Sequence, residues 1–398
     1  MDDKSEASHK FRFDRVELAG SLGDLGTLLP IVVAMILINK LSPSAVFLSF
    51  GVFYLIAGVY YRLPVPVQPL KAVGAIAIAS PALITESVIG ASGIIFGVIL
   101  LLLAFSGTVD KIAKLFTQPV VRGIQLALGL VFLRKGVELI IGKNLFLNGV
   151  AGKYAEYNIN LIIGIAVFLL VLALLDNKKL PAAIAAVAAG IVAGLLLGGF
   201  DSLRFSIGPT EMHFISPSLK DYWTAFIMLI LPQIPLTIGN ACVGTADTCY
   251  SLFPKSHMLS KTKAGKFALT MGIVNFPTGF LGAVPMCHGT GGLAAHYRFG
   301  ARTGGAPIMI GALLVVMALA FGEFGFTLLA MIPNSVLGVL LIFAGLELCP
   351  LIRSLKENEE FFVALLIAGI ALSVTNMSWA FVIGIAADLF IRKMKIKI

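Results

Sequence analysis

Long apolar segments separated by short polar ones make up most of the chain. Segments such as Leu161–Leu175 and Phe361–Val374 contain no charged residue. About 20 apolar residues in a helix cross a hydrocarbon core of ~30 Å. Only helices and closed barrels satisfy their backbone hydrogen bonds in lipid, and these apolar runs are continuous rather than alternating. The pattern therefore predicts an all-α polytopic membrane protein.

The apolar pattern divides into about fourteen transmembrane segments, and the third and tenth are too short to cross the bilayer as ordinary helices. The predicted spans are 17–39, 43–61, 66–80, 85–106, 119–141, 158–175, 180–199, 221–240, 262–283, 285–299, 304–321, 325–348, 361–375 and 376–392. The segment 108–118 fits a surface helix and a loop equally well.

Composition and charge agree with a membrane protein. Hydrophobic residues make up 58% of the chain and charged residues 13%, whereas soluble domains carry about 25% charged residues. The net charge of +9 does not indicate nucleic-acid binding, because most basic residues fall in the segments that are cytoplasmic if the chain begins inside. This bias predicts a multi-pass protein of the cell membrane with both termini cytoplasmic. Residues 1–16 then form a short cytoplasmic tail.

The two halves of the chain contain similar short motifs in the same order. Spans 1, 3 and 5 match spans 8, 10 and 12 through three pairs of motifs: Leu29-Pro30 with Leu231-Pro232, Val65-Pro66 with Val284-Pro285, and Gln118-Pro119 with Ile332-Pro333. A unit of seven spans is odd, so its second copy must enter the membrane from the opposite side. The order of the motifs thus predicts two inverted seven-span repeats.

The third span is broken by closely spaced prolines. Pro64, Pro66 and Pro69 favour an extended chain, and the small residues after Lys71 favour a helix. We therefore predict a half-helix whose N-terminus lies inside the membrane, where its free N–H groups and dipole attract anions. Lys71 would add a positive charge, and Gln68 and Leu70 would lie beside it as substrate-binding residues.

The tenth span repeats this design with glycines in place of prolines. Its segment Cys287-His288-Gly289-Thr290-Gly291 precedes a second predicted half-helix, and glycine lets the backbone approach a ligand closely. Two opposed half-helix N-termini would form a site for a small oxyanion, with all five of these residues as candidate contacts. The alternative is a pair of packing kinks.

Polar residues of the first and eighth spans are candidates to complete the site. Gln233, Thr237 and Asn240 share one face of a helix, where they would bind substrate or connect helices by hydrogen bonds. Asp24 would repel an anion unless it pairs with Lys71 or carries a proton, so it is the coupling candidate.

These segments resemble the molybdate-transporter branch of the sulfate permease superfamily. The resemblance covers the whole chain, with the longest matches at Gly23–Thr27, Pro64–Ala77, Leu231–Asn240 and Pro285–Gly304. It implies a uracil-permease-like fold with a core domain (17–107 and 201–322) and a gate domain (108–200 and 323–398). His296 departs from the glutamine expected there. We expect no regulatory STAS domain after the last span.

The resemblance implies a secondary active transporter that imports molybdate by alternating access, with proton coupling as an option. Tungstate, sulfate and nucleobases or organic anions are the alternative substrates, and a channel or an enzyme is the alternative class. The expected partners are the oxyanion, the lipid bilayer and a second copy in a homodimer. We expect no cofactor, metal, catalytic residue or nucleic acid.

Overall fold

The computed structural model describes residues 10–147, 158–175, 177, 181–199, 205–374, 377–394 and 396. The predictions for the first nine residues, for the segment 148–157 and for the last basic residues lie outside this part. Within it, regular structure is helical apart from one pair of two-residue strands. The prediction of an all-helical protein is therefore confirmed.

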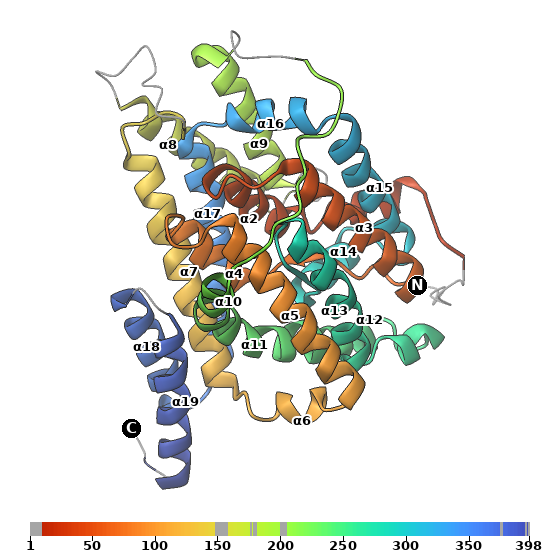
Figure 1. The fold of residues 1–398 in the computed structure, drawn as a ribbon, viewed down its shortest axis with the longest axis vertical. Helices are drawn as coiled ribbons and strands as arrows, with labels where there is room; N and C mark the ends of the chain where they lie inside the picture. Colours follow the sequence, from red (N-terminus) through yellow and green to blue (C-terminus); the bar gives the residue numbers. More distant parts are fainter. Residues whose placement is uncertain are drawn as a thin grey trace.

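The first half of the chain runs through nine helices and one short strand within the described residues (Figure 1). In order these are α1 Arg15–Ser21, α2 Leu25–Ile38, α3 Pro43–Tyr61, β1 Gln68–Pro69, α4 Lys71–Ala79, α5 Glu86–Ser106, α6 Val109–Ala113, α7 Gln118–Ile141, α8 Ile159–Leu174 and α9 Ala182–Gly194, which continues as a π-helical turn, η1 Leu195–Gly199.

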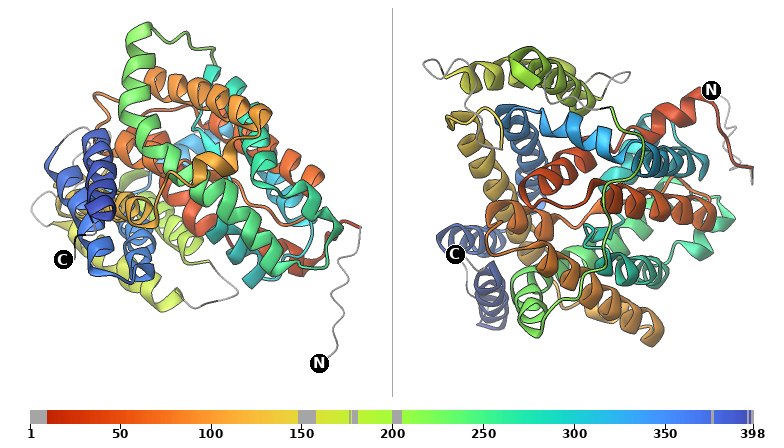
Figure 2. Two further views of the ribbon diagram at one scale, coloured as in Figure 1. Left: turned by 90° about the horizontal axis from the view of Figure 1, so that it is seen from below. Right: turned by 45° about the horizontal axis from the view of Figure 1, so that its top comes forward.

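The second half begins after an extended segment and contains the second strand. Its elements are α10 Leu219–Ala225, η3 Phe226–Ile230, α11 Leu231–Leu236, η4 Thr237–Gly244, α12 Thr245–Leu252, η5 His257–Lys261, α13 Ala264–Phe280, β2 Met286–Cys287, α14 Thr290–Arg298, α15 Gly305–Ala320, α16 Gly322–Ala330, α17 Asn334–Leu348, η6 Cys349–Ser354, α18 Asn358–Ser373 and α19 Met377–Met394. In Figures 1 and 2, α18 and α19 lie side by side at one edge of the molecule.

Several predicted spans differ from the helices that form. The first bends by 47° between α1 and α2, and Asp24 lies at the bend as the residue that precedes α2. The twelfth is interrupted before Pro333, because a residue that precedes proline disfavours helical geometry. The eighth continues instead to Leu252 as one run of 34 residues with π-helical turns around its prolines. The segment 108–118, which the sequence left undecided, contains the short helix α6.

Helices of the first half pack closely against helices of the second half. At the crossing of α7 and α17, a Cβ atom on Gly136 would lie 2.5 Å from the carbonyl oxygen of Gly338, and the reverse distance is the same. Gly129 and Gly345 are related in the same reciprocal way, at 2.9 and 2.6 Å. Carbon atoms in contact are normally about 3.5 Å or more apart, so only glycine permits this approach. Because the later residue of α7 meets the earlier residue of α17, the two helices run antiparallel.

Two more helix pairs form seams of the same kind. In α3 and α15, Gly51 meets Gly311 and Gly58 meets Gly304, and in α5 and α13, Gly90 meets Gly279. Each seam again joins an element of the first half to one of the second half. Small residues at helix crossings are typical of membrane proteins, where close backbone packing replaces a hydrophobic driving force.

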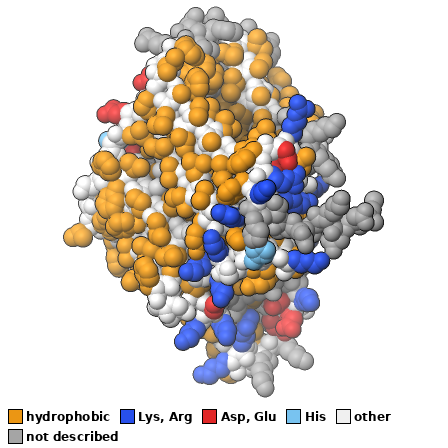
Figure 3. Space-filling view, turned by 90° about the vertical axis from the view of Figure 1, so that its right-hand side faces the viewer, with side chains coloured by type: hydrophobic (Ala, Val, Ile, Leu, Met, Phe, Trp, Pro, Cys, Tyr) orange, Lys and Arg blue, Asp and Glu red, His pale blue; other side chains and the backbone are white. Residues whose placement is uncertain are grey.

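The outer surface is strongly apolar. In Figure 3, hydrophobic side chains cover most of one face, and Lys and Arg side chains gather along one margin of it. Among the described residues, four helices are long and apolar enough to cross a membrane on their own, and the bent pair of α1 and α2 makes a fifth. α8, α9 with η1, and α15 are shorter apolar helices. The protein is therefore a multi-span membrane protein.

Candidate substrate site

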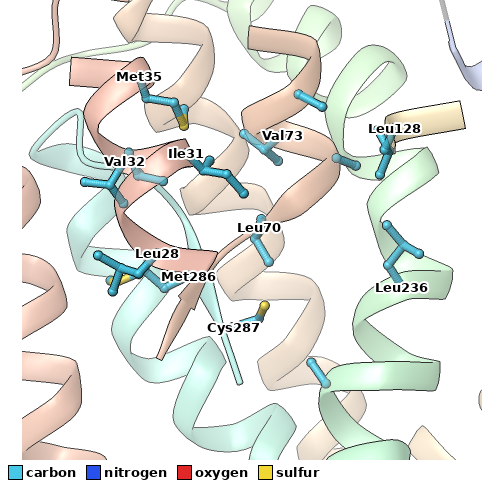
Figure 4. Packing of buried hydrophobic residues seen from close by; sticks show 14 of the residues in the cluster. Leu28, Ile31, Val32, Met35, Leu70, Val73, Leu128, Leu236, Met286 and Cys287 are labelled. Carbon is cyan, nitrogen blue, oxygen red and sulfur yellow. The ribbon is translucent and has the colours of Figure 1, made fainter. Parts of the chain in front are cut away.

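The site begins at the pair of short strands near the middle of the molecule, Gln68–Pro69 and Met286–Cys287, which we call the strand crossing. β1 pairs antiparallel with β2, with Gln68 opposite Cys287 and Pro69 opposite Met286. The backbone N–H of Leu70 then donates to the carbonyl oxygen of Pro285 at 2.9 Å. Figure 4 shows Leu70 and Cys287 close together at this crossing. Because α4 starts directly after β1 and α14 starts shortly after β2, the two helix N-termini are held near each other by this pairing.

The N-terminus of α4 is capped by a side chain from another helix. Leu70 precedes α4 and offers no side-chain cap. Instead, the backbone N–H of Ala72 donates to Oε1 of Gln233 at 2.9 Å, and Nε2 of Gln233 donates to Oγ1 of Thr237 at 2.9 Å. The amide oxygen of Gln233 thus accepts from one of the N–H groups that the sequence analysis expects to bind an anion. Lys71 is half-buried in the first turn of the same helix.

The N-terminus of α14 is covered by the amide of Gln68. A Cβ on Gly292 would lie 2.6 Å from Nε2 of Gln68 and 2.7 Å from the carboxyl group of Asp24, and one on Gly289 would overlap Oε1 of Gln68. By contrast, a Cβ on Gly291 would meet no atom within 4 Å. Glycine is therefore required at positions 289 and 292 for steric reasons and is not required at 291.

Asp24 is buried beside this amide, with 1% of its surface exposed. Its Oδ1 accepts a hydrogen bond of 2.6 Å from Nε2 of Gln68, and its Oδ2 has no hydrogen-bond partner among the residues that the structure describes. No ion pair within 4.0 Å joins Asp24 to Lys71, although the charge of Lys71 acts on both Asp24 and Glu347 of α17. Asp24 therefore packs against the strand crossing rather than directly against the lysine.

A small cavity lies between the strand crossing and the helices α7 and α17. Its volume is about 20 Å³, which is room for about one water molecule. The lining residues are Gln68, Lys71, Gln125, Leu128, Gln233, Leu236, Asn240, Ala241, Cys287 and Leu348. Within the described residues, one cation and four amide side chains thus line this space and no carboxylate does, a set of donors that suits an anion.

Comparison with known proteins shows which family this chain belongs to. The sequence model of a family described as "Molybdate transporter of MFS superfamily" matches residues 16–132 and 225–348, which include both half-helices, the first part of α7 and all of α17. This match covers more than half of the chain. The chain belongs to this molybdate transporter family. It is thus a member of a transporter family and not an enzyme.

Two plant relatives support the assignment along most of the chain. Molybdate transporter 1 of Arabidopsis thaliana is 30% identical, and the match covers 94% of this chain and 87% of the relative. Molybdate transporter 2 of the same plant is 29% identical with the same coverage. The two matches therefore extend over both halves of the chain.

The fold is similar to that of the transmembrane domain of a cyanobacterial bicarbonate transporter, BicA. The two structures superimpose with a TM-score of 0.66 over 96% of this chain and 97% of that one, at 14% sequence identity. The family description names the MFS superfamily, whereas the fold of this member is BicA-like.

The cavity brings together five of the predicted site residues of this molybdate transporter family member. Gln68, Lys71, Gln233, Asn240 and Cys287 line it. Thr237 and Thr290 do not line the cavity but bind residues that do. Oγ1 of Thr237 accepts from Gln233, and Oγ1 of Thr290 donates to Oδ1 of Asn240 at 2.7 Å. Leu70, Gly289 and Gly291 belong to the strand crossing and the start of α14 and do not line the cavity.

His288 points away from the cavity into an aromatic cluster. Its Nδ1 lies 2.8 Å from the carbonyl oxygen of Pro66, and its Nε2 lies 3.2 Å from Oγ1 of Thr270. Rings of Phe53, Tyr61 and Phe267 surround it. Because both ring nitrogens have protein partners, His288 supports the strand crossing in this conformation. His296 of α14 also contacts the segment before β1: its Nδ1 lies 2.9 Å from the carbonyl oxygen of Pro64.

Sequence reasoning did not find Gln125 of α7 among the cavity residues. The side chain is buried and is contributed by a helix for which no polar role was predicted. A buried amide in an apolar span is costly unless it is used, so the position of Gln125 within an apolar span is the signal by which the sequence could have revealed it.

Proposed function

We propose that this protein imports molybdate as a secondary active transporter. The observation that carries the proposal is the cavity at the strand crossing, where Lys71 and the N-terminus of α4 lie among amide side chains. A molybdate dianion has only acceptor oxygens and needs donors and positive charge around it. Membership of the molybdate transporter family and the names of the plant relatives support this substrate over other oxyanions.

We propose further that the substrate replaces Gln233 at the N-terminus of α4. An oxygen of the anion would accept from Ala72 N–H, where Oε1 of Gln233 accepts now. Gln233 could then turn its Nε2 toward the anion. The small cavity volume agrees with this exchange, because a tetrahedral oxyanion needs more room than about one water molecule.

Alternating access would move a core domain against a gate domain. The core consists of 17–107 and 201–322, and the gate of 108–200 and 323–398, in fourteen spans arranged as two inverted repeats. The antiparallel strand pair and the antiparallel seam of α7 with α17 support an inverted relation, since each joins matching segments of the two halves. The other two seams join the second span to the eleventh and the fourth to the ninth, two pairs that the same relation exchanges. We also propose that both termini are cytoplasmic, that the protein lies in the cell membrane, and that it forms a homodimer.

Competition binding to the purified protein tests the substrate. Radioactive molybdate bound to the detergent-solubilised protein is displaced by unlabelled molybdate, tungstate, sulfate or uracil. We expect molybdate and tungstate to compete at similar concentrations, sulfate at least tenfold more weakly, and uracil not at all. Displacement by uracil but not by tungstate would overturn the oxyanion proposal, and displacement by sulfate at lower concentrations than molybdate would reassign the substrate.

A further inference from the structure

Helix α7 places one buried amide opposite the strand crossing. Gln125 has 5% of its surface exposed and lines the same cavity as Lys71 and Asn240. The other cavity residues contributed by α7 and α17, Leu128 and Leu348, are apolar. Among the described residues, Gln125 is therefore the polar cavity residue that comes from the proposed gate.

A neighbouring arginine fixes which end of this amide faces the cavity. NH1 of Arg122 donates to Oε1 of Gln125 at 2.9 Å. Arginine has only donors, so the partner atom must be the amide oxygen, and the NH₂ group of Gln125 is left for another acceptor. The orientation of the amide thus follows from donor chemistry.

The arginine is in turn held in place by the segment that follows α17. Its Nε donates to Oγ of Ser354 at 2.8 Å, and Oγ of Ser354 donates to the carbonyl oxygen of Leu351 at 2.9 Å. Gln118, two turns before Gln125 on α7, also donates to Ser354, at 3.1 Å. Arg122 is only half-buried and is not a cavity residue, so it acts on the cavity through Gln125.

The cavity then presents donors from both sides. Oδ1 of Asn240 accepts from Thr290, which leaves its NH₂ group for a ligand, and Lys71 contributes an ammonium group. The NH₂ group of Gln125 adds a donor from the opposite wall. Polar groups in a membrane interior are costly without a partner, and an anion with four oxygen acceptors supplies partners for all three.

We propose that Gln125 is the substrate contact of the gate and that Arg122 is its positioning residue. This inference rests on the proposed oxyanion transport. A bound oxyanion would be held by Lys71 and Asn240 on one side and by Gln125 on the other, and so would connect the two domains across their interface. Gln125 thereby determines whether the site closes around a ligand that offers acceptors.

Gln125→Leu and Gln125→Met test the contact, and Gln118→Leu is the matched control. Both Gln125 variants keep the approximate volume and remove the donor. Molybdate affinity is measured by titration calorimetry on the purified full-length protein, and thermal unfolding confirms folding. We expect the dissociation constant to rise about 10- to 100-fold, as for loss of a hydrogen bond to a charged group. Gln118 is exposed and contacts the same serine, so Gln118→Leu should stay within about twofold of the wild type.

Arg122→Met and Arg122→Lys separate positioning from general stability. Arg122→Met should weaken molybdate binding, Arg122→Lys should restore part of it, and Arg122→Met should have little further effect when Gln125 is already leucine. A folded Gln125 variant that binds molybdate within twofold of the wild type would overturn the inference while oxyanion binding itself stands. A wild-type protein that binds no oxyanion would instead overturn the proposed function and this inference with it.

Discussion

In the part of the chain that the structure describes, Lys71 is the one cationic side chain that lines the cavity. It begins α4, so its charge adds to the positive end of the helix dipole. Around it stand the amides of Gln68, Gln125, Gln233 and Asn240. Amides donate hydrogen bonds without a charge that must lose its water. The side chains therefore provide one full charge and several neutral donors, a combination that fits the proposed dianion.

Replacing Lys71 by methionine should weaken molybdate binding about 10- to 100-fold, because a charge-assisted hydrogen bond contributes roughly 1.5–3 kcal/mol. The methionine keeps the length of the side chain. Titration calorimetry on the purified variant measures the effect, and Lys135→Met on α7, which lines a different cavity, is the control. Equal affinity in the Lys71 variant and the wild type would remove this lysine from the site.

Replacing Asp24 by asparagine tests coupling to protons. The asparagine oxygen can still accept from Nε2 of Gln68, so the packing of the strand crossing should be retained, while the position can no longer gain or lose a proton. If Asp24 carries the coupling proton, molybdate uptake into proteoliposomes should no longer respond to an imposed pH gradient. Uptake that keeps the pH response of the wild type would assign Asp24 a structural role.

The sequence predicts those site residues that stand out against their own neighbours along the chain. Lys71 stands out because a lysine follows prolines inside an apolar span, and Gln233 because it shares a helical face with other polar groups. The role of Gln125 depends on the approach of α7 to α4 and α11, which no local pattern reveals. His288 shows the opposite case: its neighbours in sequence predict a ligand contact, whereas a packing environment formed by distant residues uses both of its ring nitrogens.

The half-helices are elements that their own residues specify. Prolines before α4 and glycines before α14 prevent an earlier helical start, and the structure confirms a short helix after an extended segment in both places. The break before Pro333 and the π-helical turns of η3 and η4 were not predicted. Apolar character continues through all of these points, so hydrophobicity gives no signal there; the breaks lie instead beside prolines, before Pro333 and on both sides of α11 with Pro232 and Pro235.

Adjacent glycines at the start of α14 give a sharp test of this element. Gly292→Ala places a methyl group against Gln68 and Asp24, whereas Gly291→Ala places one in open space. We expect Gly292→Ala to lower stability by about 1–3 kcal/mol, as overpacking does, and to impair molybdate binding. Gly291→Ala should leave the thermal unfolding midpoint within about 2 °C of the wild type. Similar behaviour of the two variants would contradict the position of Gln68 over the helix.

At the level of the whole protein, transport requires the proposed core and gate to move past each other. One contact across this boundary joins Oγ1 of Thr27 in α2 to Oε2 of Glu347 in α17 at 3.3 Å. Such a contact between exposed polar groups is weak and is readily exchanged during movement. A covalent link between the same two positions would instead hold the two domains together throughout the cycle.

Cysteines at positions 27 and 347, joined by a short reducible thiol cross-linker, should therefore stop uptake. The background carries Cys349→Ala, because that thiol is half-buried and the other three native cysteines are buried. We expect at least a tenfold fall in molybdate uptake by proteoliposomes on cross-linking and recovery on reduction. Thr27→Cys and Glu347→Cys alone, treated identically, are the controls. Undiminished uptake by the cross-linked protein would show that this contact persists through the transport cycle.

The glycine seams have a consequence for how the protein is made. Each described seam pairs a helix of the first half with one of the second half: α3 with α15, α5 with α13, and α7 with α17. During synthesis the ribosome delivers the first half well before the partners of its helices exist. The early helices must therefore stay separate in the bilayer with their glycine surfaces exposed to lipid, and assembly waits for the C-terminal half of the chain to be inserted.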